Sequence, residues 1–302
     1  MSSSGVCRTP VPSADGRKLF VTGVLAQVEL STLDPKSHQL VPFLSGISAK
    51  DVSFSADRKW IAYIAYPQGT LWRSKLDGQD RLQLTVAPMQ AVFPRWSPDG
   101  RQIAFHAFVP GKPWQIYTIP AEGGTPVEIA PEGHSEADPD WSPDGNSLVF
   151  GSLPWLETST PQAVHIYILD FTTHRISSLP GSQGLFSPHW SPDGRYIASL
   201  SSDSQRIMLF DFKTQKWSEL VHIVASYPTW SHDGQYVYFH HPGSQPSLMR
   251  VRIQDHKLEQ LINLKIPRVR PWSWFGLTPD DSPILMREVG AQEIYAIDWD
   301  AR

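Results

Sequence analysis

Cysteine is almost missing from this 302-residue chain, which contains one, Cys7. A single cysteine forms no disulfide within the chain and no thiolate metal cluster. No apolar run is long enough to span a bilayer, and the first residues, MSSSGVCRTPVPSADG, lack the apolar core of a signal peptide. We therefore expect no membrane association. We place the chain as given in the cytoplasm, although a parent protein could carry it elsewhere.

Positive charge is not in excess either. The chain has 26 Lys and Arg against 30 Asp and Glu, for a net charge of −4, which argues against nucleic acid as a partner. Long helical periodicity, a serine-hydrolase elbow, a P-loop and a dinucleotide fingerprint are also missing. What the chain does have is 27 prolines, 20 glycines and 12 tryptophans. This composition is typical of many short elements separated by turns.

One short pattern, FPRWSPDGRQIAF, recurs along the chain. The aspartates of its seven copies are 40 to 49 residues apart, which is the length of one four-stranded propeller blade. The full copies lie at Phe93–Phe105, Asp138–Phe150, Ser187–Ser199 and Tyr227–Phe239, and looser copies at Pro12–Val21, Phe54–Tyr63 and Leu277–Met286.

Each unit predicts four strands. A short strand ends at the Trp, and Ser-Pro-Asp-Gly forms a turn because Pro presets φ and Gly accepts a positive φ. Two apolar strands and a more polar one follow. The sequence therefore predicts an all-β, seven-bladed β-propeller of four-stranded antiparallel blades, as one domain over 1–302. The blades are expected to begin near Thr9, Ser48, Gln90, Glu136, Leu185, Ser226 and Pro271.

The last unit shows only three strands, the third at Glu293–Trp299. We expect the last blade to be incomplete or closed by the N-terminus, where residues 1–10 make a poor strand sequence. An open edge predicts self-association of the chain through this blade.

The repeated residues themselves indicate scaffold. Trp96, Trp141, Trp190 and Trp230 are expected to fill the wedges between neighbouring blades, and the turn aspartates to cap their own turns. Function is therefore to be sought where the copies differ.

The WSPDG turn followed by IAF-type and IY-type strands resembles the bacterial propeller repeat of TolB-like proteins. Ala65–Thr85 and Trp274–Asp300 also resemble the C-terminal propeller of bacterial winged-helix transcriptional regulators. The resemblance implies a non-catalytic interaction or sensor module, part of a larger regulatory protein, with a protein or peptide partner and no cofactor. The chain has no winged helix and no basic recognition helix, so DNA binding is not implied.

Two alternatives rest on the variable positions near the channel mouth, where residues of one inner-strand face converge. His106, Asp138 and His240, with His134 and Glu136 nearby, predict a Zn²⁺, Mn²⁺ or Ca²⁺ site and a hydrolase of the lactonase or phosphotriesterase kind. The aromatic run at Arg270–Gly276 predicts a wall for a carbohydrate or another small ligand.

Overall fold

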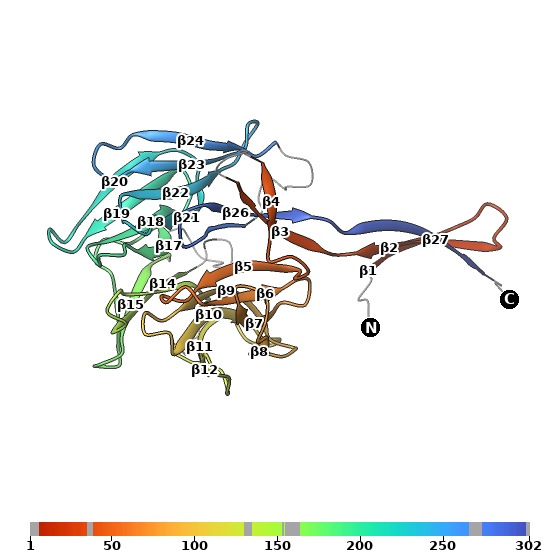
Figure 1. Ribbon diagram of the computed structural model, residues 1–302, viewed down its shortest axis with the longest axis horizontal. Helices are drawn as coiled ribbons and strands as arrows, with labels where there is room; N and C mark the ends of the chain where they lie inside the picture. The colour runs from red at the N-terminus through yellow and green to blue at the C-terminus, as the bar shows by residue number, and fades with distance from the viewer. Residues whose placement is uncertain are drawn as a thin grey trace.

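The computed structural model describes residues 6–34, 39–129, 135–152, 154, 164–265 and 274–299. These residues form 27 strands in seven antiparallel sheets, and none of them is helical. The all-β propeller fold predicted from the repeat is confirmed (Figure 1).

Five of the sheets are consecutive repeats, with the first strand of each innermost. They are β5 (Ala49–Phe54), β6 (Trp60–Ala65), β7 (Thr70–Lys75) and β8 (Leu82–Gln83); β9 (Gln90–Trp96), β10 (Gln102–Phe108), β11 (Gln115–Pro120) and β12 (Val127–Glu128); β13 (Glu136–Trp141), β14 (Ser147–Ser152), β15 (Ile166–Asp170) and β16 (Arg175–Ser178); β17 (Leu185–Trp190), β18 (Tyr196–Ser201), β19 (Arg206–Asp211) and β20 (Lys216–His222); and β21 (Ser226–Trp230), β22 (Tyr236–His241), β23 (Ser247–Arg252) and β24 (Leu258–Asn263). Four of these five begin at the predicted blade start, and β5 begins one residue after Ser48.

A composite sheet closes the ring. It pairs β25 (Phe275–Leu277) and β26 (Pro283–Glu288) with β3 (Val28–Leu33) and β4 (Leu40–Phe43), in that order. β25 contacts β21 on one side and β5 on the other, so six four-stranded blades form the ring. Closure by an N-terminal segment is confirmed, but residues 28–43 provide it in place of residues 1–10.

The seventh sheet differs from the expected four-stranded blade. It has three strands, in the order β1 (Val6–Pro12), β2 (Lys18–Leu25) and β27 (Ala291–Asp298), and it projects from the ring as an arm (Figure 1). The arm keeps the repeat's turn, in which Ser13 Oγ donates to Asp15 Oδ1 at 2.5 Å. The described residues therefore form seven antiparallel sheets, as the repeat count predicts, with six of them in the ring and the seventh as the arm.

A single long ribbon explains this difference. β2 pairs with β27 from Lys18↔Asp298 to Leu25↔Ala291, and β3 pairs with β26 from Val28↔Glu288 to Ile284↔Thr32, without a change of register between the two ladders. The repeat places a hairpin between its second and third strands. Here β2 continues directly into β3, and β26 continues directly into β27, without such a hairpin. A side chain at Gly290 would collide with the backbone oxygen of Leu25 at this crossing.

The repeated residues have the packing roles that the sequence predicts. Trp141 Nε1 donates to Arg95 O in the preceding blade at 3.1 Å, and Trp230 Nε1 donates to His189 O at 2.9 Å. Trp96 and Trp190 join buried clusters that include the preceding blade.

The turn aspartates cap their own turns, as the sequence predicts. In one copy Asp99 Oδ1 accepts from Ser97 Oγ at 2.6 Å and from the backbone N–H of Arg101 at 3.0 Å. The serine hydrogen bond is the main reason that the pKa of Asp99 lies below its usual value.

Candidate functional site

The inner strands carry the same backbone distortion in five blades. The residue three before the Trp position has a left-handed φ between 47° and 55°, and the first two strands of these blades change register there. A left-handed φ costs a non-glycine residue about 1 kcal/mol. Its effect is to place five different side chains around the channel, which are Asp51, Phe93, Asp138, Ser187 and Tyr227.

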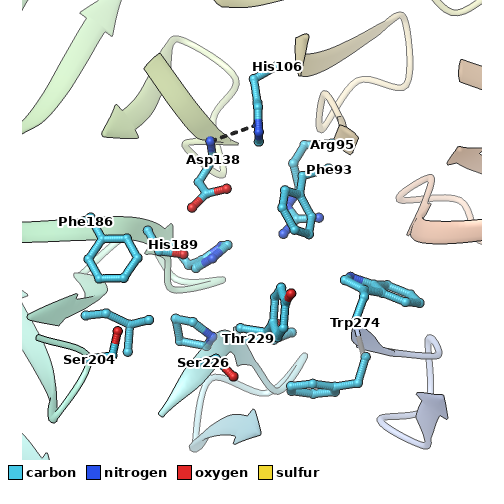
Figure 2. A pocket seen from close by; sticks show the side chains of 15 residues that line it. Phe93, Arg95, His106, Asp138, Phe186, His189, Ser204, Ser226, Thr229 and Trp274 are labelled. Carbon is cyan, nitrogen blue, oxygen red and sulfur yellow. Dashed lines mark hydrogen bonds between the residues drawn. The ribbon is translucent and has the colours of Figure 1, made fainter. Parts of the chain in front are cut away.

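A cavity of about 250 Å³ is lined by four of these side chains, Phe93, Asp138, Ser187 and Tyr227 (Figure 2). Five of the six ring blades contribute to it. Its aromatic lining comes from Phe93, Phe186, Tyr227, Trp274 and Phe275, and its polar lining from Arg95, His106, Asp138, Ser187, His189, Ser204, Ser226 and Thr229.

A second cavity of about 220 Å³ lies nearer the WSPDG turns, between the next set of inner-strand residues. Five residues line both cavities and so lie between the two parts of the channel: Arg95, His189, Thr229, Trp274 and Phe275.

Side chains of one blade accept hydrogen bonds from backbone N–H groups on the inner strand of the next blade. Ser53 Oγ accepts from the backbone N–H of Trp96 at 3.4 Å, and Asp140 Oδ2 accepts from the backbone N–H of Trp190 at 2.9 Å. The inner strands have no ladder partner on the channel side, so these contacts pair backbone donors that would otherwise be buried without an acceptor. Ser53 and Asp140 are therefore structural residues of the channel wall.

Burial dominates the electrostatics of the channel. It raises the pKa of Asp138 to about 6, against a hydrogen bond from Ser187 and the nearby charge of Arg95. It raises the pKa of Asp140 to about 6 as well, although Arg95 Nε lies 3.7 Å from Asp140 Oδ1. Arg95 is the cation shared by both carboxyl groups.

His106 is a neutral side chain. Its Nδ1 accepts a hydrogen bond from the backbone N–H of Asp138 at 3.2 Å (Figure 2), and its ring packs between Phe93 and Trp114. Burial, with the charges of Lys50 and Arg95, lowers the pKa of His106 to about 3. The acceptor role of Nδ1 leaves the proton on Nε2.

The three residues predicted to bind metal are brought together only in part. His106 and Asp138 contact one another, whereas His240 Nδ1 lies 3.1 Å from Ser226 Oγ and does not line either cavity. Burial lowers the pKa of His240 to about 4. Within the described ranges, no three His, Cys, Asp or Glu side chains are placed to share a metal ion. His134 lies outside those ranges, and Glu136 is buried at the start of β13.

The comparisons with known proteins agree with this architecture. Residues 49–277, from the start of β5 to the end of β25, match the model of the TolB beta propeller domain. The chain belongs to this family. The match spans the five consecutive blades and the first strand of the composite blade, and it leaves the arm outside.

A TolB homologue of Chlorobium chlorochromatii is 32% identical over 169 residues, which are 55% of this chain and 35% of that relative. The chain thus spans about a third of the length of this curated relative. A structure described as a TolB of Agrobacterium tumefaciens has a TM-score of 0.68 and 20% identity over 87% of this chain and 98% of its own. The TolB structure of Acinetobacter baumannii has a TM-score of 0.58 and 18% identity over 94% of this chain and 81% of its own. These two structural likenesses concern the fold.

Much of the channel lining follows from the repeat register of this TolB-type propeller. Phe93, Asp138, Ser187 and Tyr227 sit three residues before the Trp position, and Arg95 one residue before it, as the alternation of strand side chains requires. His241 lies on the opposite face from His240, as the same rule predicts, with its Nδ1 2.8 Å from Val224 O.

Sequence reasoning missed the residues outside that register. Phe186 and Phe275 line the first cavity next to register positions, and Trp114 supports His106 from a loop. Of the aromatic run at Arg270–Gly276, only Trp274, Phe275 and Gly276 are among the described residues, and the first two line both cavities. The left-handed inner-strand residue has no sequence signal of its own, because the five copies carry four different residue types at this position.

Proposed function

We propose that this TolB-family propeller is a non-catalytic protein-interaction module whose channel mouth receives side chains from an extended segment of a partner protein. The observation that carries the proposal is a circle of aromatic side chains around the channel mouth. Phe93, Phe186, Tyr227 and Trp274 come from four different blades and surround one cavity. Aromatic side chains in a concave site offer a large apolar contact area.

The size and polarity of the cavity also support a peptide segment. Its volume of about 250 Å³ lies below the ~300–1,000 Å³ of sites that enclose a drug-sized ligand, and it suits one or two side chains. Arg95 supplies a cation near these aromatic side chains. Hydroxyl groups come from Ser187, Ser226 and Thr229. We therefore expect an apolar side chain next to a carboxylate or a backbone carbonyl in the bound segment.

Selection from a random peptide library tests the proposal. The Tyr227→Arg variant fills the mouth with a charged side chain, and Val127→Arg places the same change on β12, where Val127 is 57% exposed. We expect wild type and Val127→Arg to enrich the same peptides, and Tyr227→Arg to lose them. Peptides retained by Tyr227→Arg would place binding elsewhere on the propeller and contradict the proposal.

The hydrolase alternative has no comparable support. Its three predicted ligands share no cavity, and His106 Nδ1 is already engaged by a backbone N–H. Elemental analysis after incubation with Zn²⁺, Mn²⁺ or Ca²⁺ tests it independently. A stoichiometric ion that is lost in both His106→Ala and Asp138→Ala would contradict the non-catalytic proposal. Placement in a larger regulatory protein stays a prediction based on the resemblance of Ala65–Thr85 and Trp274–Asp300.

A further inference from the structure

The outer edge of the arm is an uncovered strand. In every ring blade the third strand is covered by a fourth, as β11 is covered by β12. In the arm, β27 occupies the place of the third strand, and among the described strands it pairs with β2 alone. All eight residues of β27 are exposed. Its outward backbone groups form a template for another strand.

Other edges of the fold carry features that discourage such pairing. The opposite edge of the arm, β1, contains Pro10 and Pro12 and changes register between Arg8 and Val11. In the ring, the outer strands β8 and β12 have two residues each, and β4 contains Pro42. β27 contains neither proline nor lysine and pairs with β2 without a bulge. It is therefore an unprotected edge.

The ladder with β2 fixes which groups of β27 point outward. The backbone N–H of Trp299 donates to Arg17 O at 2.8 Å, and that of Val289 donates to Gln27 O at 3.0 Å. Odd-numbered residues of this stretch therefore direct their backbone groups toward β2. The backbone groups of the even-numbered residues point away from it, and these residues are Gln292, Ile294, Ala296 and Asp298.

We propose that β27 pairs antiparallel with β27 of a second copy of this chain, with Tyr295 on the two-fold axis. This register pairs all four outward residues with one another, Gln292 with Asp298 and Ile294 with Ala296 of the second copy. Neither carboxylate faces a carboxylate, because Glu293 lies opposite Ile297 and Asp298 opposite Gln292. The two arms then form one continuous six-stranded sheet.

The apolar surface of the arm supports a second copy as the occupant. Seven of the twelve exposed large apolar residues in the described part of the chain lie on the arm, among them Ile294 at 77% and Tyr295 at 51% exposure. Ile294, Tyr295, Ile297 and Trp299 would lie along the paired edge, where contacts between side chains of neighbouring strands stabilise a sheet. Isologous pairing places the same surface on both sides of one axis.

Molecular mass in solution tests the pairing. We expect wild type to show about twice the chain mass by light scattering at high concentration. Ala296→Pro removes an outward N–H without removing a β2 hydrogen bond, and Ile294→Lys adds a charge to the edge, so both should halve the mass. The control Val127→Lys alters an exposed valine on β12 and should leave the dimer intact. A wild type with the mass of one chain at every concentration, or unchanged masses in both arm variants, would overturn the proposal.

Disulfide trapping tests the register. In a Cys7→Ser background, Tyr295→Cys places two thiols opposite each other in a non-hydrogen-bonded pair, where Cα atoms are ~4.5 Å apart and within bridging range. Glu293→Cys places each thiol opposite Ile297 of the second copy. We expect oxidation to link Tyr295→Cys chains and to leave Glu293→Cys chains unlinked. Equal linkage of both variants, or linkage of Glu293→Cys alone, would contradict the pairing.

Discussion

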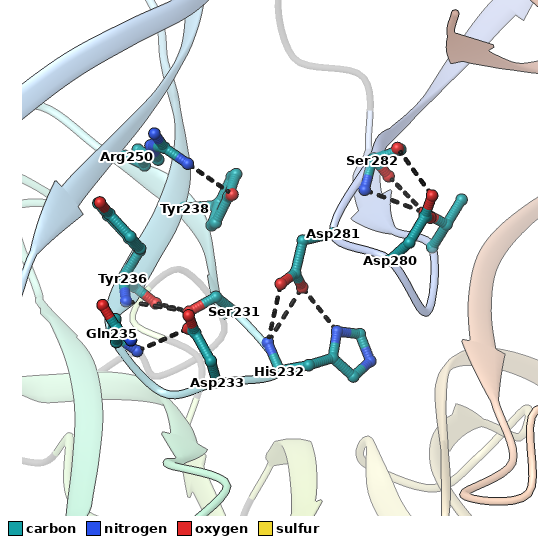
Figure 3. Close-up of polar contacts among 11 residues, drawn as sticks. Ser231, His232, Asp233, Gln235, Tyr236, Tyr238, Arg250, Asp280, Asp281 and Ser282 are labelled. Atoms are coloured by element: carbon teal, nitrogen blue, oxygen red, sulfur yellow. Dashed lines mark hydrogen bonds and ion pairs between the residues drawn. The ribbon is translucent and has the colours of Figure 1, made fainter. Parts of the chain in front are cut away.

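Asp281 accepts hydrogen bonds from two groups of His232 in the neighbouring blade, the backbone N–H at 3.0 Å and ring Nδ1 at 2.6 Å (Figure 3). His232 replaces the proline of the SPDG turn, and Asp281 replaces the glycine. Three other blade boundaries have proline and glycine at these positions and pack them together: Pro98 with Gly145, Pro143 with Gly194 and Pro192 with Gly234. A polar pair thus joins the composite blade to the ring where these three blade boundaries use an apolar contact.

The first prediction concerns this pair. His232→Pro removes both donors to Asp281, so we expect a loss of about 1 kcal/mol in the free energy of unfolding. Asp281→Gly alone loses the same hydrogen bonds but relieves the left-handed φ of 63° at this position, so its net loss should be smaller. The double variant restores the proline–glycine contact and should be more stable than the sum of the single losses, by about 1 kcal/mol in a double-mutant cycle followed by urea unfolding. Strictly additive losses would show that the two residues do not act together.

The second prediction concerns the wedges between blades. Trp141 stacks on Phe171 and packs with Ala104 and Ile116 of the preceding blade. Trp141→Ala should lower the free energy of unfolding by about 3–5 kcal/mol, as large core truncations do. Chemical denaturation provides the measurement, and an unchanged midpoint would argue against the packing role.

The third prediction separates the indole hydrogen bond from the packing. Trp230 Nε1 donates to His189 O, whereas no partner is found within the described residues for Trp190 Nε1. Trp230→Phe should therefore cost about 1 kcal/mol more than Trp190→Phe, because only the first leaves a carbonyl oxygen without its donor. Thermal unfolding of the two variants measures the difference, and equal losses would assign the whole effect to ring size.

The fourth prediction concerns pH. The pKa of Asp138 is about 6 in the folded chain against 3.8 as its ordinary value, so the folded state holds this proton more tightly. The resulting stability is fully present below the unfolded pKa and is lost as pH rises through about 6. Asp138→Asn cannot titrate. Wild type should therefore lose stability relative to Asp138→Asn as pH rises. The free energy of unfolding of Asp138→Asn minus that of wild type should increase by about 2 kcal/mol from roughly pH 4 to pH 7.

A matched control for this pH experiment is Asp99→Asn. The pKa of Asp99 is lowered, chiefly by Ser97, so its contribution is present above the unfolded pKa and lost as pH falls. Relative to wild type, Asp99→Asn should therefore change with pH in the direction opposite to Asp138→Asn. Urea unfolding across the pH range measures both, and parallel curves would contradict the assigned shifts.

The sequence predicts the parts of this fold that depend on local chemistry. The WSPDG turn sets blade length and the first two strands, and Trp141 and Trp230 pack where their repeat position requires. Strand alternation places Phe93, Arg95 and Asp138 at the channel. These features need only short-range steric rules and the two-residue period of a strand.

The pairing of the third strands could not be predicted in the same way. β3 and β27 both carry the alternating pattern of a third strand, so the pattern does not choose between β2 and β26 as the neighbour of each. The choice depends on ring geometry, which a linear sequence does not display. The separation of His240 from His106 and Asp138 likewise depends on the three-dimensional size of the ring.

The composite blade also has a consequence for the order of events during synthesis. Thr32 Oγ1 donates to Pro283 O, a contact across 251 positions, and β3 pairs with β26 on one side and with β4 on the other. These strands therefore leave the ribosome about 250 residues before the partner with which they pair. Forming this contact closes a long loop, which costs chain entropy. Until then the nascent chain carries an unsatisfied sheet edge, which is a target for chaperones and a starting point for misassembly.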